Sequence, residues 1–485
     1  MADVPPPNDV GMPKEPINLM RGWPNPSLLP VDLIKSAANT ALSDPAVAHA
    51  GLLYGPDPGY EACREAVADW LTSFYQPQQK IDADRICITG GASQNLGCML
   101  GVYTDPEYTR NIWIVAPAYM LAFRVFEDAG FGGKMRAVVE DEEGIDLHHL
   151  RQELQKSEKR ATEKGVERPR YKPERKRAKV YKHIVYCVPT FANPSSRTMS
   201  LRRREDLVKL AREYDALVVA DDVYDFLQWP AHPSQQASTA SSLPAMQTAH
   251  LPRLVDIDRA LDGGAARDGA DGFGNVCSNG SFSKIAGPGI RVGWLEGTEK
   301  FAYGVSQAGV TASGGAPSQL TSTYITTLLT TGQLHHHITT VLRPAYTARY
   351  HTLMRAITAH LLPLGFSLPQ PDRDVVGGYF VWLALPASLS ATRLAQRCKH
   401  CGDDDDAVII APGPIFEVPG DESAAGFDGH VRLCFAWEEE WKLAEGVRRV
   451  GEVAKRMLED HDGEAGNGGY VVVEREARGG MDQYK

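Results

Sequence analysis

Short, continuous apolar runs, each closed by turn residues, constrain this chain more than any other feature. The clearest are residues 85–89 (RICIT), 111–116 (NIWIVA), 183–188 (HIVYCV) and 216–220 (ALVVA). A helical pattern over 95–103 follows the first run. Strands that are apolar along their whole length are typical of a parallel sheet covered by helices on both faces. We therefore predict an α/β fold with a mostly parallel sheet.

The pattern changes towards the C-terminus. Residues 343–362 predict a long helix, and a second helix is expected over about 438–460. Between them lie short, partly alternating runs that predict strands at 379–385, 407–411 and 430–435. This mixture predicts a smaller α+β domain over 336–462.

Four segments fall outside these patterns. Residues 1–16 are Pro-rich and 463–485 are Gly-rich, so both are expected to be loose. Residues 151–182 hold 13 Lys or Arg against five Glu. A solvated helix and loop explains this charge, and an anionic docking patch is the alternative. Residues 231–275 are rich in Ser, Ala, Gly and Asp, which predicts a surface loop with little structure. We interpret the two internal segments as insertions.

Composition excludes several classes of protein. Of 485 residues, 43% are hydrophobic and 23% are charged, as in a globular chain with a real core. The formal net charge of −10 argues against a general nucleic-acid binder. No run of about 18 apolar residues and no N-terminal signal pattern is present, so we expect no membrane partner. Cysteines such as Cys87 and Cys187 lie inside apolar runs, as in a reduced, cytoplasmic protein.

The segment SNGSFSKIAGPGIRVGWL, residues 278–295, suggests a specific chemistry. A lysine amine such as Lys284 can form a Schiff base with a carbonyl when it is unprotonated. The hydroxyls of Ser281 and Ser283 and the guanidinium of Arg291 can hold a phosphate. An aldehyde and a phosphate together point to pyridoxal phosphate, although a solvated loop lysine explains the segment equally well by itself.

Two further segments lie where a strand is predicted to end. Asp221 and Asp222 follow an apolar run, with Tyr224 close behind. Ligands of open α/β sheets bind at the carboxyl ends of strands, where a carboxylate could keep a pyridine nitrogen protonated. Helix capping is the plainer interpretation of an Asp pair. The turn at 90–94 (GGASQ) precedes a helix, whose amide groups could bind an anion.

Nine motifs from residue 17 to residue 460 stand in the order of one family. They are INLMRGWPNPSLLP, YGPDPGYEACREAVADWL, ITGGASQ, APAYMLAFRVFEDAGF, VPTFANPSS, VVADDVYDFL, GSFSKIAGPGIRVGW, GGYFVWL and VRLCFAW. The chain resembles the fold-type I pyridoxal-phosphate-dependent aminotransferases of class I/II. Within them it is most similar to the branch of 2-aminoadipate, kynurenine and valine-type aminotransferases and MocR-like regulators, without the DNA-binding domain of the latter.

The resemblance implies an architecture like that of aspartate aminotransferase. A large pyridoxal-phosphate-binding domain with a seven-stranded type of sheet would cover 51–335. Residues 17–50 would form an N-terminal arm and part of the small domain. The protein would be a homodimer.

The resemblance also assigns roles to single residues. Lys284 would carry the cofactor as a Schiff base and move the substrate proton. Asp221, rather than Asp222, would pair with the pyridine nitrogen, because the family spacing Asp-x-x-Tyr ends at Tyr224. Tyr224 and Asn193 would contact the phenolate oxygen of the cofactor, and Tyr119 would lie on the face of its ring. The phosphate would be bound by Ser93, Gln94, Ser281 and Arg291, and by Tyr54 across the dimer. Arg432, with Asn193 and the Gly22 main chain, would bind the substrate α-carboxylate, and no metal ligand is implied.

One loop departs from the family pattern. Ser195 and Ser196 follow Asn193-Pro194 where the family has Thr-Gly. A positive φ at Ser196 would be strained, so this loop is expected to be remodelled. The long segment after Tyr224 is a second departure and could cover the entrance of the site.

Three other candidates are weaker. Cys398 and Cys401 have zinc-like spacing but no second pair. The three histidines at 335–337 are contiguous, so a helix would point them to different faces. Arg21 could recognise an acidic side chain, but a solvated arginine is the simpler interpretation.

We expect an aminotransferase that moves the α-amino group of an amino acid to a 2-oxo acid through pyridoxamine phosphate. A lyase, decarboxylase or cyclising enzyme on the same scaffold would need the same cofactor residues and is the alternative. A non-catalytic, pyridoxal-phosphate-binding regulatory module is a third possibility, which the presence of Lys284 disfavours.

Overall fold

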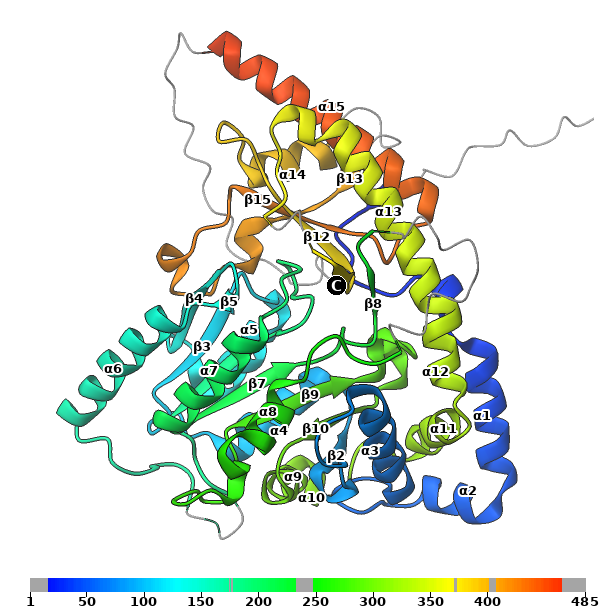
Figure 1. The fold of residues 1–485 in the computed structure, drawn as a ribbon, viewed down its shortest axis with the longest axis vertical. Coiled ribbons are helices and arrows are strands. Elements are labelled where there is room, and N and C mark those ends of the chain that lie inside the picture. Colours follow the sequence, from blue (N-terminus) through cyan, green and yellow to red (C-terminus); the bar gives the residue numbers. More distant parts are fainter. Residues whose placement is uncertain are drawn as a thin grey trace, which may run out of the picture.

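The computed structural model describes residues 16–173, 175, 178–232, 247–369, 373–400 and 407–464. An eight-stranded sheet with helices on both faces forms the larger part, and a smaller body of strands and long helices lies above it (Figure 1). The strand order is β2-β10-β9-β7-β6-β3-β4-β5. The strands are β2 (Ile86–Thr89), β3 (Asn111–Ala116), β4 (Met135–Asp141), β5 (Gly144–Ile145), β6 (His183–Cys187), β7 (Ala216–Asp221), β9 (Val276–Ser281) and β10 (Gly293–Glu296).

The sheet is mostly parallel, as predicted. Strands β9, β7, β6, β3 and β4 run in one direction, whereas β10 is antiparallel to both β2 and β9. The two-residue β5 adds an antiparallel edge to the seven longer strands. Strand β3 has the predicted bounds, and β2, β6 and β7 differ from the predicted runs by one residue at an end.

Alternate residues of each strand pack on opposite faces of the sheet. In β3, Ile112 and Ile114 contact the core under α4, α5 and α9, whereas Trp113 and Val115 contact the core under α6, α7 and α8. A strand covered on both faces is therefore apolar along its length. The covering helices are α4 (Ala92–Tyr103), α5 (Met120–Phe126), α9 (Glu299–Ser306), α6 (Leu147–Glu163), α7 (Leu201–Glu213) and α8 (Leu254–Ala260).

The smaller body has its own antiparallel sheet, in the order β12-β15-β14. It contains β12 (Phe380–Ala384), β14 (Ala411–Pro412) and β15 (His430–Cys434), with α13 (Arg343–His360), α14 (Ala391–Lys399) and α15 (Glu440–Glu464). The N-terminal β1 (Ile17–Asn18) pairs in parallel with β13 (Val408–Ile409), so the start of the described chain joins the C-terminal part. Strand β8 (Gln228–Pro230) pairs with β11 (Val375–Gly377).

Helices also surround the N-terminal segment. Helices α1 (Val31–Ser43) and α2 (Pro45–Leu52) pack against α11 (Gln319–Thr330), and α3 (Glu61–Tyr75) packs against α11 and β2. The short helices α10 (Gly309–Ala312) and α12 (Gln333–His337) complete the set, and a π turn over Ile338–Leu342 joins α12 to α13. None of the helices described has both the length and the apolar character that crossing a bilayer needs.

Several sequence expectations are wrong in detail. The described residues 247–275 are not a loop with little structure, because α8 lies there with buried Leu254 and Ile257 against the sheet. The first part of 151–182 belongs to α6, whose apolar side packs on the sheet, so this part is not solvated on all sides. The single strand expected at 407–411 is two strands, β13 and β14, which pair with different partners.

Two further expectations concern the boundary between the domains and the ends of the chain. The domain boundary expected after residue 335 falls inside α12, within one helical rod that continues into α13. The segments expected to be loose lie outside the described residues, except for Pro16 and the last two residues of α15.

Candidate active site

Two neighbouring parallel strands bring the predicted lysine and aspartate together. Strand β7 ends at Asp221 and β9 ends at Ser281, and Asp221 stands opposite Asn279. Lys284 ends the 3-10 turn that follows β9, and its Nζ donates to the carbonyl oxygen of Gly22 at 2.8 Å. Because carboxyl ends of parallel strands share one edge of the sheet, these groups meet at the usual ligand position of an open α/β sheet.

Lys284 lies in surroundings that favour its neutral form. Burial lowers the pKa of Lys284 to about 8; Arg432 also lowers it, while Cys434 and Asp221 oppose this effect. The ammonium lies 5.9 Å from the ring centre of Tyr224 and 5.2 Å from that of Tyr379. A lysine that is partly unprotonated near neutral pH can act as a nucleophile or as a base.

Asp221 presents an acceptor that no described residue satisfies. Its Oδ2 accepts from the hydroxyl of Tyr186 at 2.7 Å, whereas its Oδ1 is buried without a hydrogen-bond partner. Burial raises the pKa of Asp221 to about 6. A buried acceptor left unpaired is costly, so this atom needs a donor from a bound group.

Asp222 faces a different set of partners. It accepts from the hydroxyl of Ser278 and lies with Asp225 and Arg253 in a buried charged network behind β7. Burial and the charge of Asp225 raise the pKa of Asp222 well above its usual value. The two adjacent aspartates therefore have separate surroundings, with only Asp221 next to Lys284.

Arg432 projects from β15 towards the same region. Its Nη1 donates to Asn193 Oδ1 at 2.7 Å, its Nη2 donates to the carbonyl of Met20, and its Nε is buried without a partner among the described residues. The guanidinium also lies 4.0 Å from the ring centre of Phe380. Burial lowers the pKa of Arg432 to about 10, so it is still charged at neutral pH.

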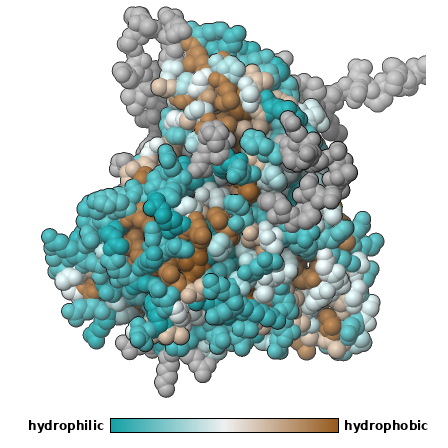
Figure 2. All heavy atoms as spheres, viewed as in Figure 1, coloured by the Kyte–Doolittle hydropathy of each residue, from teal (hydrophilic) through white to brown (hydrophobic). Residues whose placement is uncertain are grey.

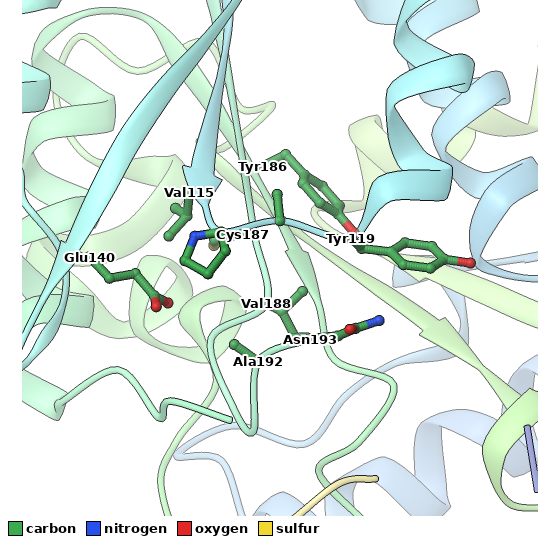
Figure 3. A pocket seen from close by; sticks show the side chains of 10 residues that line it. Val115, Tyr119, Glu140, Tyr186, Cys187, Val188, Ala192 and Asn193 are labelled. Carbon is green, nitrogen blue, oxygen red and sulfur yellow. The ribbon is translucent and has the colours of Figure 1, made fainter. Parts of the chain in front are cut away.

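Tyr119 and Asn193 lie beside a small pocket at the edge of the sheet. Figure 3 shows their side chains pointing to the same side, away from Glu140. Burial raises the pKa of Tyr119 to about 12; Asp221 adds to this shift and Arg432 opposes it. Tyr119 is therefore electrostatically coupled to the aspartate at the end of β7 and to the arginine of β15.

The start of α4 lies next to Arg291, an arrangement that suits an anion. The first amides of a helix have no partners within it, so the main chain of Ser93 and Gln94 can bind an anion. Gly91, at φ 108°, allows a close approach, since a Cβ there would lie 3.1 Å from Arg291 Nη2. Ser281 lies at the end of β9, and its Oγ is 2.8 Å from that of Ser283.

Ser196 adopts the left-handed backbone conformation that glycine accepts most easily. Its φ is 57°, the positive value that the sequence analysis identified as strained for a serine. The amide of Ser196 donates to the Ala192 carbonyl at 2.7 Å, and its buried hydroxyl donates to the Phe380 carbonyl. These bonds compensate a conformation that costs most residues about 1–2 kcal/mol.

Not every candidate residue joins this site. Tyr54 is 90% exposed, so it is not enclosed with Lys284, Asp221 and Arg432. Arg21 is not simply solvated, because its guanidinium lies 5.0 Å from the ring of Trp23 and 4.8 Å from that of Trp437. Cys398 is buried, and Cys401 lies outside the described residues. His337 hydrogen-bonds the Leu28 carbonyl.

Three residues at the site were missed by sequence reasoning. Tyr186 lies within an apolar run and gave no signal beyond burial in the core. Tyr379 and Phe380 belong to a quoted motif, GGYFVWL, but nothing in its spacing indicated contact with Lys284 or Arg432.

Comparison with known proteins decides the family. The sequence profile of aminotransferase class I and II matches residues 25–450. The chain belongs to the aminotransferase class I and II family. This aminotransferase is 34% identical to an uncharacterized protein of Saccharomyces cerevisiae over 90% of its own length and 97% of the relative.

Relatives with named activities are more distant. The aromatic-amino-acid aminotransferase 1 of Thermococcus litoralis is 27% identical, over 91% of this chain and 88% of the relative. The 2-aminoadipate transaminase of Thermus thermophilus is also 27% identical, over 90% and 89%.

Solved structures share the fold. A multiple substrate aminotransferase from Thermococcus profundus superposes with a TM-score of 0.70 at 26% identity, covering 92% of this chain and 93% of that one. The α-aminoadipate aminotransferase of Thermus thermophilus, complexed with N-(5'-phosphopyridoxyl)-L-leucine, gives 0.68 at 26% identity, with coverage of 92% and 93%.

The cofactor of this aminotransferase is pyridoxal 5'-phosphate. The described residues fit this group on three independent observations. Asp221 Oδ1 is a buried acceptor in need of a donor, Lys284 is a buried amine of lowered pKa, and the start of α4 with Arg291 suits a phosphate.

Proposed function

We propose that this aminotransferase transfers the amino group of α-amino acids with Lys284 as the residue that moves the substrate proton. The observation that carries the proposal is the half-buried Lys284, whose amine has a lowered pKa, beside the carboxylate of Asp221, one oxygen of which no described residue satisfies. Pyridoxal phosphate supplies an aldehyde for the exchange of amines and a ring that withdraws electrons from the substrate Cα.

The cofactor would be held along its whole length by residues of this chain. Asp221 Oδ1 would accept from the pyridine nitrogen, and a charged Asp221 would keep that nitrogen protonated. Tyr186 would hold the carboxylate in place through its 2.7 Å bond to Oδ2. The remaining contacts are proposed for Tyr224 and Asn193 at the phenolate oxygen, Tyr119 on the ring face, and Ser93, Gln94, Ser281 and Arg291 at the phosphate.

The substrate would be oriented by Arg432. A guanidinium binds a carboxylate in a bidentate manner, and the free Nε of Arg432 is one donor available for this purpose. Asn193 and the Gly22 main chain would complete the carboxylate site. With the α-carboxylate fixed, the Cα proton can be placed within reach of Lys284 Nζ, which removes it in its neutral form.

We also propose that the amino donors carry large side chains, either aromatic or of the 2-aminoadipate type. The names of the relatives from Thermococcus and Thermus support this choice. The rim of the site offers aromatic rings for an aromatic side chain and a positive charge for an acidic one, since Arg21 lies next to the indoles of Trp23 and Trp437. The acceptor would be a 2-oxo acid.

We propose that the protein is a homodimer and that it is cytoplasmic. In each subunit, residues 17–50 and 336–462 would form the small domain. Apolar side chains at the end of α2 support a dimer: Leu52 is 67% exposed and Leu53 is 69% exposed, next to Tyr54. Figure 2 shows apolar surface at the lower right, over the region where Figure 1 draws α2. Tyr54 would bind the phosphate of the second subunit, and its 90% exposure in a single chain supports such a contact.

A half-reaction tests the function directly. The purified protein, loaded with pyridoxal phosphate, is mixed with single amino acids in the absence of any 2-oxo acid. We expect the visible absorbance of the bound cofactor to disappear while an equivalent amount of the matching 2-oxo acid forms. The Lys284→Ala variant should form none. Release of carbon dioxide or ammonia with a persistent visible band would contradict the proposal.

A further inference from the structure

Two buried tyrosines form a hydrogen-bonded pair that ends on the main chain of Lys284. The hydroxyl of Tyr379, just before β12, donates to the Lys284 carbonyl oxygen at 3.0 Å. The hydroxyl of Tyr346, on α13, lies 3.1 Å from that of Tyr379. Neither tyrosine is accessible to solvent. A phenol has one hydrogen to donate, so Tyr346 must be the donor to Tyr379.

The main chain around Lys284 depends on this contact. The amides of Ile285, Ala286 and Gly287 all donate to the Phe282 carbonyl, which closes the turn that carries the lysine. The Lys284 carbonyl itself takes no main-chain donor among the bonds described and is met by Tyr379 instead. Its side chain is held separately, by the bond from Nζ to Gly22.

The ring of Tyr379 also faces the reactive end of the lysine. Its centre lies 5.2 Å from Nζ. The same tyrosine therefore contacts Lys284 at the carbonyl through its hydroxyl and approaches the amine through its ring. Tyr346 and Tyr379 both come from the C-terminal body, whereas Lys284 follows a strand of the large sheet, so this contact joins the two parts of the molecule.

We propose that Tyr379 is a positioning residue that fixes the Lys284 turn for proton transfer, and that Tyr346 orients its hydroxyl. The proposal rests on the proposed role of Lys284. Proton transfer requires an approach within hydrogen-bond distance, and a displacement of about 1 Å at a reacting group costs about 10²-fold in rate. Removing either hydroxyl removes support for the lysine without touching the residues proposed to bind substrate.

The test uses Tyr379→Phe, which deletes the hydroxyl and keeps the ring. In the half-reaction with an amino acid, we expect the limiting rate constant to fall by up to about 10²-fold. The dissociation constant of the amino acid should stay close to that of the wild type, because Arg432 is unchanged. Tyr346→Phe should shift the rate in the same direction and by less, because Tyr379 can still donate.

A second readout does not depend on the cofactor. Hydrogen–deuterium exchange of the apo-protein measures the opening of the turn, and the amides of Ile285, Ala286 and Gly287 should exchange faster in Tyr379→Phe. Tyr181→Phe is the matched control: its buried hydroxyl donates to the Gly274 carbonyl at 2.7 Å, away from Lys284. That variant should lose stability to a similar extent and leave both the rate and the exchange of this turn unchanged.

The outcomes separate this proposal from the proposed function. Wild-type rate and exchange in Tyr379→Phe, or equal changes in Tyr379→Phe and Tyr181→Phe, would overturn the positioning role. A Lys284→Ala variant with full half-reaction activity would instead overturn the role of the lysine itself. If Lys284→Ala is inactive and Tyr379→Phe is normal, only the positioning role fails.

Discussion

Replacing Arg432 by alanine separates what this residue does for the substrate from what it does for the fold. Its Nη1 and Nη2 donate to Asn193 and Met20, and its Nε is free for a ligand. A hydrogen bond to a charged group is worth about 1.5–3 kcal/mol. Loss of the carboxylate contact should therefore raise the dissociation constant of the amino acid by roughly 10–150-fold.

The same substitution also has a structural cost. It leaves the Asn193 amide oxygen and the Met20 carbonyl without their donor, and a buried acceptor left unsatisfied costs about 1–3 kcal/mol. The melting temperature of Arg432→Ala should fall as well. Arg212→Ala is the matched control, because Arg212 is a largely buried arginine that donates to Asp258 and to the Leu261 carbonyl, away from the site.

Half-reaction kinetics at several amino-acid concentrations distinguish the two effects. The limiting rate constant should change much less than the dissociation constant in Arg432→Ala, and Arg212→Ala should lower only the melting temperature. Arg432→Lys retains the charge but not the bidentate geometry, so its affinity should lie between wild type and alanine. An unchanged dissociation constant in Arg432→Ala would refute the carboxylate assignment.

Three further predictions concern other parts of the site. Ser196→Gly should be more stable than Ser196→Ala by about 1 kcal/mol, because both lose the hydroxyl bond and only glycine relieves the positive φ; equal melting temperatures would contradict the strain. The pKa of Lys284 is lowered to about 8, so its neutral fraction rises as the pH passes 8, and the rate at which the apo-protein captures pyridoxal phosphate should rise over the same range. A midpoint near the ordinary lysine value of about 10.4 would refute its burial in the apo-protein. Gly91→Ala should weaken phosphate binding, because the new Cβ crowds Arg291 and the residue has φ 108°. The variant should therefore lose its cofactor faster than the wild type on dialysis.

Much of the large sheet was predictable because its strands are covered on both faces. Runs such as NIWIVA in β3 are apolar without interruption, and few other structures require this. Strand β9 was missed for the opposite reason, since VCSNGS is polar in composition yet fully buried. The amide oxygen of Asn279 accepts from the side chain of Asn95 at 2.6 Å, a contact that joins residues far apart in the chain.

Helix α8 was missed because it lies in a segment dominated by small and polar residues. Its buried charges are paired by tertiary contacts: Arg253 forms a two-pronged ion pair with Asp256 and a third bond to Glu296 on β10. Local composition indicates a solvated loop, since charged residues are mostly exposed. Only the packed structure supplies the partners that offset the desolvation cost of burying these charges.

The sequence by itself determined the family, the α/β class and the strand end that carries Asp221, and it identified Lys284 by motif order, because these follow from local pattern and motif order. Tertiary structure alone decided which groups meet there. It brought the Gly22 carbonyl to Lys284 Nζ, the Tyr379 hydroxyl to the Lys284 main chain and Arg432 to Asn193. It also left one oxygen of Asp221 without a partner in the part of the chain that the structure describes. The periodicity of apolar residues in the sequence indicates which face of a helix or strand is buried. The partner of a buried polar atom, in contrast, depends on how distant segments pack.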